Sequence, residues 1–297
     1  MSIENPYASP QTAATLTFNR PRYVSDQSWS WLWFPVTAAF AVVGSCALAY
    51  LLAVLFRAGY YWIFIVPLVF TIATATLVAA AVYWGQCRNR WLGGTLGLAC
   101  GLTTYLGYFY CDMVAAVGPD VQGRLDLLPA YIFHRVTTDV STSTHNPNPQ
   151  VQRPIVFLNA LTFVAELGLF VCYVPLVGWH TAERAFDPQR GRWSTLKYIV
   201  LPQGTSERIK HALASGTLGP VLQTHEAIPP QVNTPHCLLT LELLRTADSP
   251  VVILSAREFR MPGQVSLIND LVAFFPRTIP KIQLEPLEAE IALRWFA

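Results

Sequence analysis

Four long apolar runs constrain this chain of 297 residues more than any other feature of its sequence. They extend over residues 31–56, 60–84, 91–117 and 155–179. Each run is longer than the roughly 20 apolar residues that an α-helix needs to cross a bilayer. The runs therefore predict a membrane α-helical protein with four transmembrane helices.

Composition supports this assignment to the membrane. Only 13% of the residues are charged, whereas soluble domains carry roughly 25%. No Asp, Glu, Lys or Arg occurs between Arg57 and Arg88, or between Arg90 and Asp112. A charge-free stretch of at least about 18 residues is typical of a transmembrane span.

The first 28 residues are polar and hold few large apolar side chains, so we expect a disordered tail. This tail opens with the motif NPYASP at positions 5–10. The motif resembles the start of multi-pass membrane proteins from planctomycete-type bacteria, a group with no assigned activity. The resemblance covers only this short motif. It implies a bacterial inner-membrane location and no particular chemistry.

Basic residues near the spans predict the orientation, because Lys and Arg concentrate in cytoplasmic loops. With the N-terminus inside, the cytoplasmic side receives twice as many of them as the outer side. Both termini are therefore predicted to be cytoplasmic, and residues 118–153 form an external loop. The inner group is Arg20, Arg22, Arg88, Arg90, Arg184, Arg190, Arg192 and Lys197, and the outer group is Arg57, Arg124, Arg135 and Arg153.

Within the external loop, residues 126–136 combine apolar side chains with His134 and Arg135. This pattern predicts a short amphipathic helix that lies on the membrane. Residues 137–152 are rich in Ser, Thr, Asn and Pro, which favours irregular structure.

Residues 194–297 have the composition of an ordinary globular domain, with nearly equal numbers of acidic and basic side chains. The absence of a basic run argues against a nucleic-acid partner. Periodicity predicts strands at 196–201, 237–245, 251–258 and 281–284, and helices at 206–214 and 267–275. This order of elements predicts a cytoplasmic α/β domain, with a ferredoxin-like βαββαβ fold as the specific expectation.

Glu166 is the main candidate for a functional residue, because a carboxyl near the centre of a span is expensive and usually has a reason to be there. Helical spacing places three polar residues on its face, and counting from the outer ends of the other spans places three hydroxyls at its depth. One interpretation is a station for protons or cations; the other is a protonated carboxyl that clasps a neighbouring helix. The predicted polar cluster comprises Glu166, Asn159, Thr162, Tyr173, Thr104, Ser45 and Thr71.

Gly93, Gly97 and Gly101 form a GxxxGxxxG motif in the third span. Glycines at this spacing let another helix backbone approach closely. The motif therefore predicts tight packing, either within the chain or in a homo-oligomer.

Other polar residues carry weaker hypotheses. Asp112 and Arg57 lie at outer ends of spans, where they form an ion pair or extend separately to water. Asp112, His134 and Arg135 are the candidate residues for an enzyme at the outer surface, the weakest of these hypotheses. No recognised catalytic, nucleotide-binding or zinc motif occurs, and we predict no cofactor and no metal.

The leading expectation is a non-enzymatic membrane-anchored interaction or regulatory module whose cytoplasmic domain binds a protein partner. Its support is that the domain is too large for a tail and lacks a catalytic signature. The alternative is a small proton or cation conduit centred on Glu166.

Overall fold

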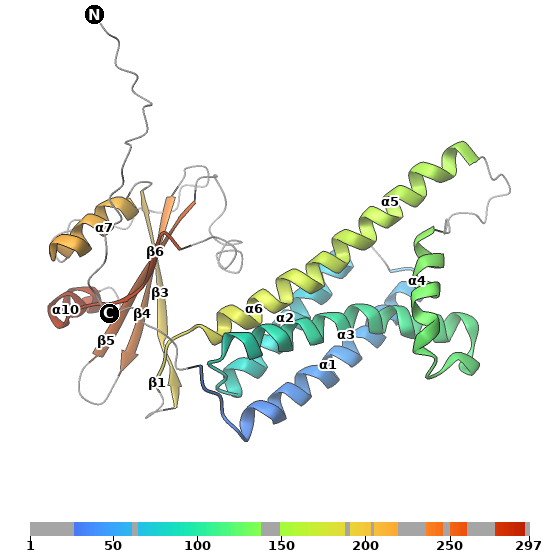
Figure 1. The fold of residues 1–297 in the computed structure, drawn as a ribbon, viewed down its shortest axis with the longest axis horizontal. Coiled ribbons are helices and arrows are strands. Elements are labelled where there is room, and N and C mark those ends of the chain that lie inside the picture. Colours follow the sequence, from blue (N-terminus) through green and yellow to red (C-terminus); the bar gives the residue numbers. More distant parts are fainter. Residues whose placement is uncertain are drawn as a thin grey trace, which may run out of the picture. The chain divides into compact units, whose positions relative to one another are not determined.

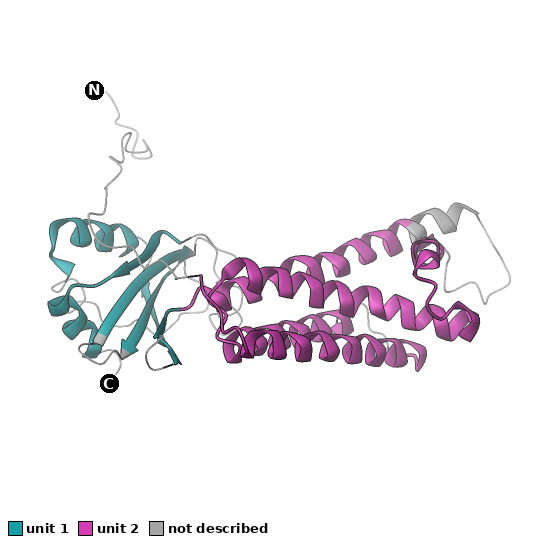
Figure 2. Ribbon diagram, turned by 60° about the horizontal axis from the view of Figure 1, so that its bottom comes forward, with its two compact units in different colours: residues 1–24, 185–297 teal, residues 25–184 magenta. Residues whose placement is uncertain are grey.

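The computed structural model describes residues 27–60, 65–137, 149–187, 191–202, 205–218, 236–245, 250–259 and 277–294. The chain divides into two compact units, coloured separately in Figure 2. Residues Ser25–Arg184 form the helical unit, and the chain from Ala185 onward forms the sheet unit. The predicted tail and the predicted helix at 267–275 lie outside the described residues, apart from the last two tail positions.

The helical unit is a bundle of long helices (Figure 1). Helix α1 covers Trp33–Arg57, α2 covers Ile65–Trp84 and α3 covers Arg90–Val117. The last span is a continuous helix in three parts: α5 (Pro149–Gly168), the π-helical turn η3 (Leu169–Tyr173) and α6 (Val174–Ala182). Two 3₁₀ turns, η1 (Pro119–Val121) and η2 (Leu125–Leu127), lead into α4 (Leu128–Thr137).

Among the described residues, three helical segments are long and apolar enough to cross a membrane. They are α1, α2 and the segment Phe157–Ala182. Helix α3 is as long as the others but is rich in Gly, Thr and Tyr, which have low hydropathy. The structure therefore supports three of the four predicted spans by length and composition.

Helix α4 confirms a short helix in the predicted external loop, but its inner face packs against the bundle. Leu128, Tyr131 and Ile132 contact the core of the helical unit. Phe133 lies on the opposite side and is 70% exposed. The helix is thus docked by one face onto neighbouring helices rather than held by lipid alone.

The glycines of α3 form the closest helix contact in this unit. A Cβ atom added at Gly97 would lie 2.6 Å from the Cα atom of Pro175 and 2.7 Å from the carbonyl oxygen of Val174. At Gly93 it would lie 2.5 Å from the carbonyl oxygen of Gly178, and at Gly101 it would meet the carbonyl of Phe170. The predicted packing motif therefore operates within the chain, between α3 and the last span.

The sheet unit contains a four-stranded antiparallel sheet with the order β3-β4-β5-β6 (Figure 1). A short hairpin of β1 (Phe186–Asp187) and β2 (Arg192–Trp193) precedes it. The strands of the main sheet are β3 (Thr195–Pro202), β4 (His236–Arg245), β5 (Pro250–Phe259) and β6 (Ile279–Gln283).

Helices α7 (Thr205–Ser215) and α10 (Pro286–Leu293) cover one face of this sheet and build its core. Side chains alternate along each strand, so Leu239, Leu241 and Leu243 of β4 face this core. Residues at the positions between them, including Thr240 and Glu242, face the other side and are buried as well. Both faces of β4 are therefore enclosed.

The strand order corrects the predicted ferredoxin-like fold. In a split βαβ unit, the two strands that flank a helix are separated by another strand. Here β3 and β4 flank α7 and are direct antiparallel neighbours, with Ile199 opposite Leu239. The sequence gives the order of elements along the chain, which is similar in both arrangements, but not which strands pair.

The glycine contact yields a prediction for stability. Gly97→Ala should lower the free energy of unfolding of the helical unit by about 1–3 kcal/mol, because the new methyl group meets backbone atoms that cannot rotate away. Gly168→Ala is the matched control, since a Cβ there meets nothing within 4 Å. The control should be neutral or stabilise by up to about 1 kcal/mol. Unfolding in detergent, followed by circular dichroism, measures both; equal stabilities would contradict the contact.

Candidate functional site

Glu166 is buried where α3 meets the last span, with only 3% of its surface exposed. The hydroxyl oxygen of Tyr105 lies 3.3 Å from its Oε2 atom and 3.3 Å from the carbonyl oxygen of Phe163. The Tyr105 ring stacks on Phe170 with 5.2 Å between centroids and also contacts Phe109 and Phe163. Aromatic rings thus pack around the buried ring of Tyr105, a residue that was not predicted from the sequence.

The predicted hydroxyls are buried, as expected, but they bond mainly to helix backbone. Ser45 donates to the carbonyl of Ala41 at 2.8 Å, and Thr71 donates to that of Pro67 at 2.7 Å. Thr104 lies 3.2 Å from the hydroxyl of Thr74 and 3.5 Å from the carbonyl of Ser45. Each hydroxyl has one proton to donate, so these groups already have acceptors.

The remaining cluster residues lie on the last span itself. Asn159 and Thr162 are half-buried in α5. Helical spacing places both on the helix face that carries Glu166. Tyr173 is half-buried at the end of η3. A π turn holds one residue more than an α turn, so it rotates the following residues by about 100°. The regular spacing that placed Tyr173 beside Glu166 therefore does not apply.

A second polar group lies at the end of α3. Asp112 is buried, and its Oδ2 atom accepts a hydrogen bond from the Tyr131 hydroxyl of α4 at 2.6 Å. The same oxygen lies 3.4 Å from Nε of Arg135, whose guanidinium sits 4.8 Å above the ring of Phe56. Burial raises the pKa of Tyr131, and the neighbouring carboxylate adds to the effect. The cation that pairs with Asp112 is thus Arg135, and this group holds α4 on the bundle.

The hypothetical outer enzyme site does not converge. Asp112 and Arg135 are together, but His134 is exposed on α4. Successive residues of an α-helix point about 100° apart, so His134 and Arg135 face different directions. The contacts give Asp112 and Arg135 a role in packing α4 against the bundle.

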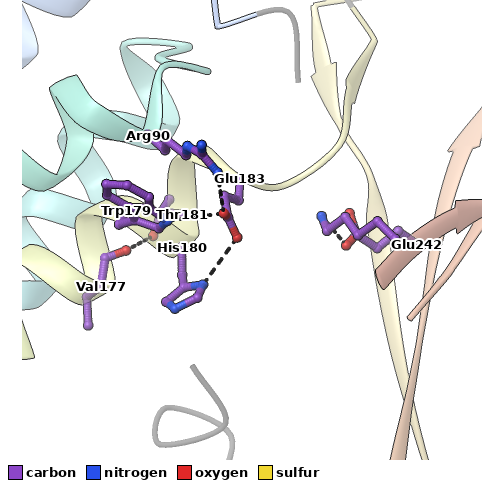
Figure 3. A network of polar contacts seen from close by, with 8 residues as sticks. Arg90, Val177, Trp179, His180, Thr181, Glu183 and Glu242 are labelled. Carbon is purple, nitrogen blue, oxygen red and sulfur yellow. Dashed lines mark hydrogen bonds and ion pairs between the residues drawn. The ribbon is translucent and has the colours of Figure 1, made fainter. Parts of the chain in front are cut away.

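A third group joins the beginning of α3 to the end of α6 (Figure 3). Glu183 accepts a hydrogen bond from Nε1 of Trp179 at 3.1 Å. It also lies 3.7 Å from Nη1 of Arg90 and 3.5 Å from Nδ1 of His180. Arg90 stacks 5.0 Å from the centre of the Trp179 ring. Because Arg90 is half-exposed, the ion pair alone contributes little stability.

A buried ion pair lies in the sheet unit, where the sequence analysis found no candidate. Glu242 of β4 contacts Nζ of Lys281 of β6, and their side chains are 4% and 8% exposed. The second carboxylate oxygen of Glu242 accepts bonds from the backbone N–H of Ala185 at 3.0 Å and from the Ser194 hydroxyl at 3.2 Å. Since β5 separates β4 from β6, Lys281 reaches across a whole strand. This carboxylate therefore fixes the chain before and after the β1–β2 hairpin to the sheet.

The cysteines of the loops and the sheet are protected. Burial raises the pKa of Cys237 to about 12 and that of Cys87 to about 11. Thiolates are the reactive form, so both thiols are chemically quiet in the folded chain. Within the described segments, no group of three or more His, Cys, Asp or Glu residues is placed to hold a metal ion.

Comparisons with known proteins add no further assignment. No protein-family model, curated protein or solved structure matches this chain. The argument about function therefore depends on the residues and contacts described above.

The buried ion pair predicts a large effect of a small change. Glu242→Gln keeps an acceptor for Ala185 and Ser194 but removes the negative charge that contacts the buried Lys281 ammonium. We expect a loss of about 3–5 kcal/mol in the unfolding free energy of the sheet unit. Glu207→Gln is the control, because the Glu207–Lys210 pair lies on the surface and should contribute at most about 0.5 kcal/mol. Denaturant unfolding of the full chain compares the two; similar losses would refute a special role for Glu242.

Proposed function

We propose that the protein is a membrane-anchored interaction or regulatory module, without enzymatic activity, of the bacterial inner membrane. In this proposal α3 is the fourth span, both termini are cytoplasmic and the sheet unit binds a protein partner. The observation that carries this proposal is that the fold is divided into two separate units. The sheet unit has a hydrophobic core of its own, and the helical unit has another.

The distribution of charge supports α3 as a span. Its 28 residues extend about 42 Å at 1.5 Å per residue, more than the roughly 30 Å of a hydrocarbon core. Its charged residues, Arg90 and Asp112, lie near its two ends. Each is paired there, with Glu183 and with Arg135. The low hydropathy of the segment between them suits a helix that faces other helices.

The use of the buried carboxylates supports a role without catalysis. Asp112 and Glu242 are each engaged by donors from other elements of the same unit. Glu183 likewise joins two helices. Side chains that satisfy one another in this way stabilise a fold and position its parts.

The glycine motif bears on oligomerisation. Gly93, Gly97 and Gly101 face the backbone of the chain's own last span. A homo-oligomer would therefore have to use another surface. We propose no interface for such a homo-oligomer.

The partner is the testable core of the proposal. The full chain, purified in mild detergent, should retain a stoichiometric protein partner, and a chain that ends after Arg184 should lose it. Glu207→Gln serves as a matched surface control and should leave the partner bound. Mass spectrometry and size measurement report the composition. Equal retention by the truncated chain would place the binding site in the helical unit and contradict the proposal.

A conduit for protons or cations is the second candidate. It is favoured by the burial of Glu166 and by the π turn directly after Gly168, since such turns are frequent at functional sites. Under this alternative, Glu166→Gln should abolish pH-dependent flux in vesicles while the bundle stays folded. Unchanged flux would remove the alternative.

A further inference from the structure

Three consecutive apolar side chains project from the helical unit where α1 begins. Trp31, Leu32 and Trp33 are 81%, 67% and 56% exposed. Tryptophan is highly buried on average in folded proteins. Large apolar side chains that gather on a surface mark a site of interaction with a protein or a membrane.

The residues on either side hold this segment, residues 31–33, in a fixed turn. The N–H of Trp33 donates to Oγ of Ser30 at 3.3 Å, and the N–H of Phe34 donates to the carbonyl oxygen of Ser30 at 3.0 Å. Before the segment, the Trp29 ring lies 5.8 Å from the ring of Phe34, which is buried in the core of the helical unit. The exposed side chains therefore stand on backbone that is fastened to the bundle.

Two more exposed tryptophans lie at the same end of the helical unit. The carbonyl oxygen of Ser28 accepts a hydrogen bond from the N–H of Arg88 at 2.8 Å, which joins the chain before α1 to the loop between α2 and α3. Trp84 is the last residue of α2 and Trp91 lies in the first turn of α3. They are 68% and 60% exposed. Exposed indoles thus gather where these three helices meet.

We infer that residues 31–33 insert into the headgroup region of a phospholipid bilayer, at the level of Trp84 and Trp91. An indole combines a large apolar surface with one polar N–H group. This combination suits the boundary between acyl chains and headgroups, where Trp is enriched in membrane proteins. The inference rests on the membrane location of the helical unit and does not depend on the protein partner of the sheet unit.

Continuity with the surface of α1 selects lipid as the occupant. Farther along this helix, Phe40 and Val43 are also exposed, and α1 is long and apolar enough to cross a membrane. The exposed apolar surface therefore continues from residues 31–33 into the part of α1 that a bilayer covers. The residues that begin such a span lie at the interface between lipid and water.

Depth-dependent fluorescence quenching in vesicles tests this inference. In a cysteine-free background, Leu32→Cys carries a polarity-sensitive fluorophore, and the purified full chain is reconstituted into vesicles of phosphatidylcholine and phosphatidylglycerol. Nitroxide lipids labelled near the headgroup should quench this probe more strongly than lipids labelled near the end of the acyl chain. Its emission should lie to the blue of a probe at His211→Cys, a position exposed on α7.

Val43→Cys is the internal reference within the same helix. It lies about 16 Å farther along the chain at 1.5 Å per residue, so the deep nitroxide should quench its probe more strongly than the shallow one. Trp31→Cys, at the neighbouring exposed position, should repeat the profile of position 32. The test then does not depend on a single variant.

The possible results separate this inference from the membrane location. An unquenched probe at position 32 beside a quenched probe at position 43 would overturn the inference and leave the location intact. Stronger quenching at position 32 by the deep nitroxide would also overturn it. If neither probe were quenched, the helical unit would not lie in the bilayer, and the inference would fail together with the proposed location.

Discussion

The close approach of α3 to the last span is the contact on which the helical unit depends. Gly97 lets the backbone at Pro175 approach closely, and Gly93 does the same for Gly178. Lipid offers no hydrophobic drive between helices, so such contact is a main source of their association. The same packing brings two pairs of polar side chains together along these helices, Tyr105 with Glu166 and Arg90 with Glu183. The polar contacts are consequences of this packing.

The acidic residues with described contacts show how each unit uses charge. Asp112 accepts a hydrogen bond from Tyr131 and forms an ion pair with Arg135, both in α4, and these contacts hold α4 on the bundle. Glu242 performs a similar task in the sheet unit, where a buried lysine balances it. Glu166 of the last span accepts a hydrogen bond from the phenol of Tyr105 in α3. In each case the partner comes from another secondary-structure element, so the carboxyl group specifies which elements meet.

Periodicity and charge predicted most of the elements but few of the pairings. The glycine motif predicted tight packing, yet only the structure identifies its partner as the last span, at η3 and α6. The π turn at Leu169–Tyr173 was not predicted, because no local signal in the sequence marks an extra residue in a helix. Glu242 and Lys281 meet across β5, which requires a strand order that a single sequence does not contain. Helix α10 was missed although Glu285 and Glu288 form a capping box with Pro286 at its start, a signal visible in the sequence.

The central claim of the proposal is that the end of α3 lies at the outer surface and the sheet unit lies in the cytoplasm. Two single cysteines in a cysteine-free background test it: Gln122→Cys, exposed after α3, and His211→Cys, exposed on α7. With an impermeant thiol reagent on intact cells, the account predicts labelling at position 122, and labelling at position 211 only after permeabilisation. The opposite pattern would contradict the account, because the end of α3 would then lie inside and the sheet unit outside.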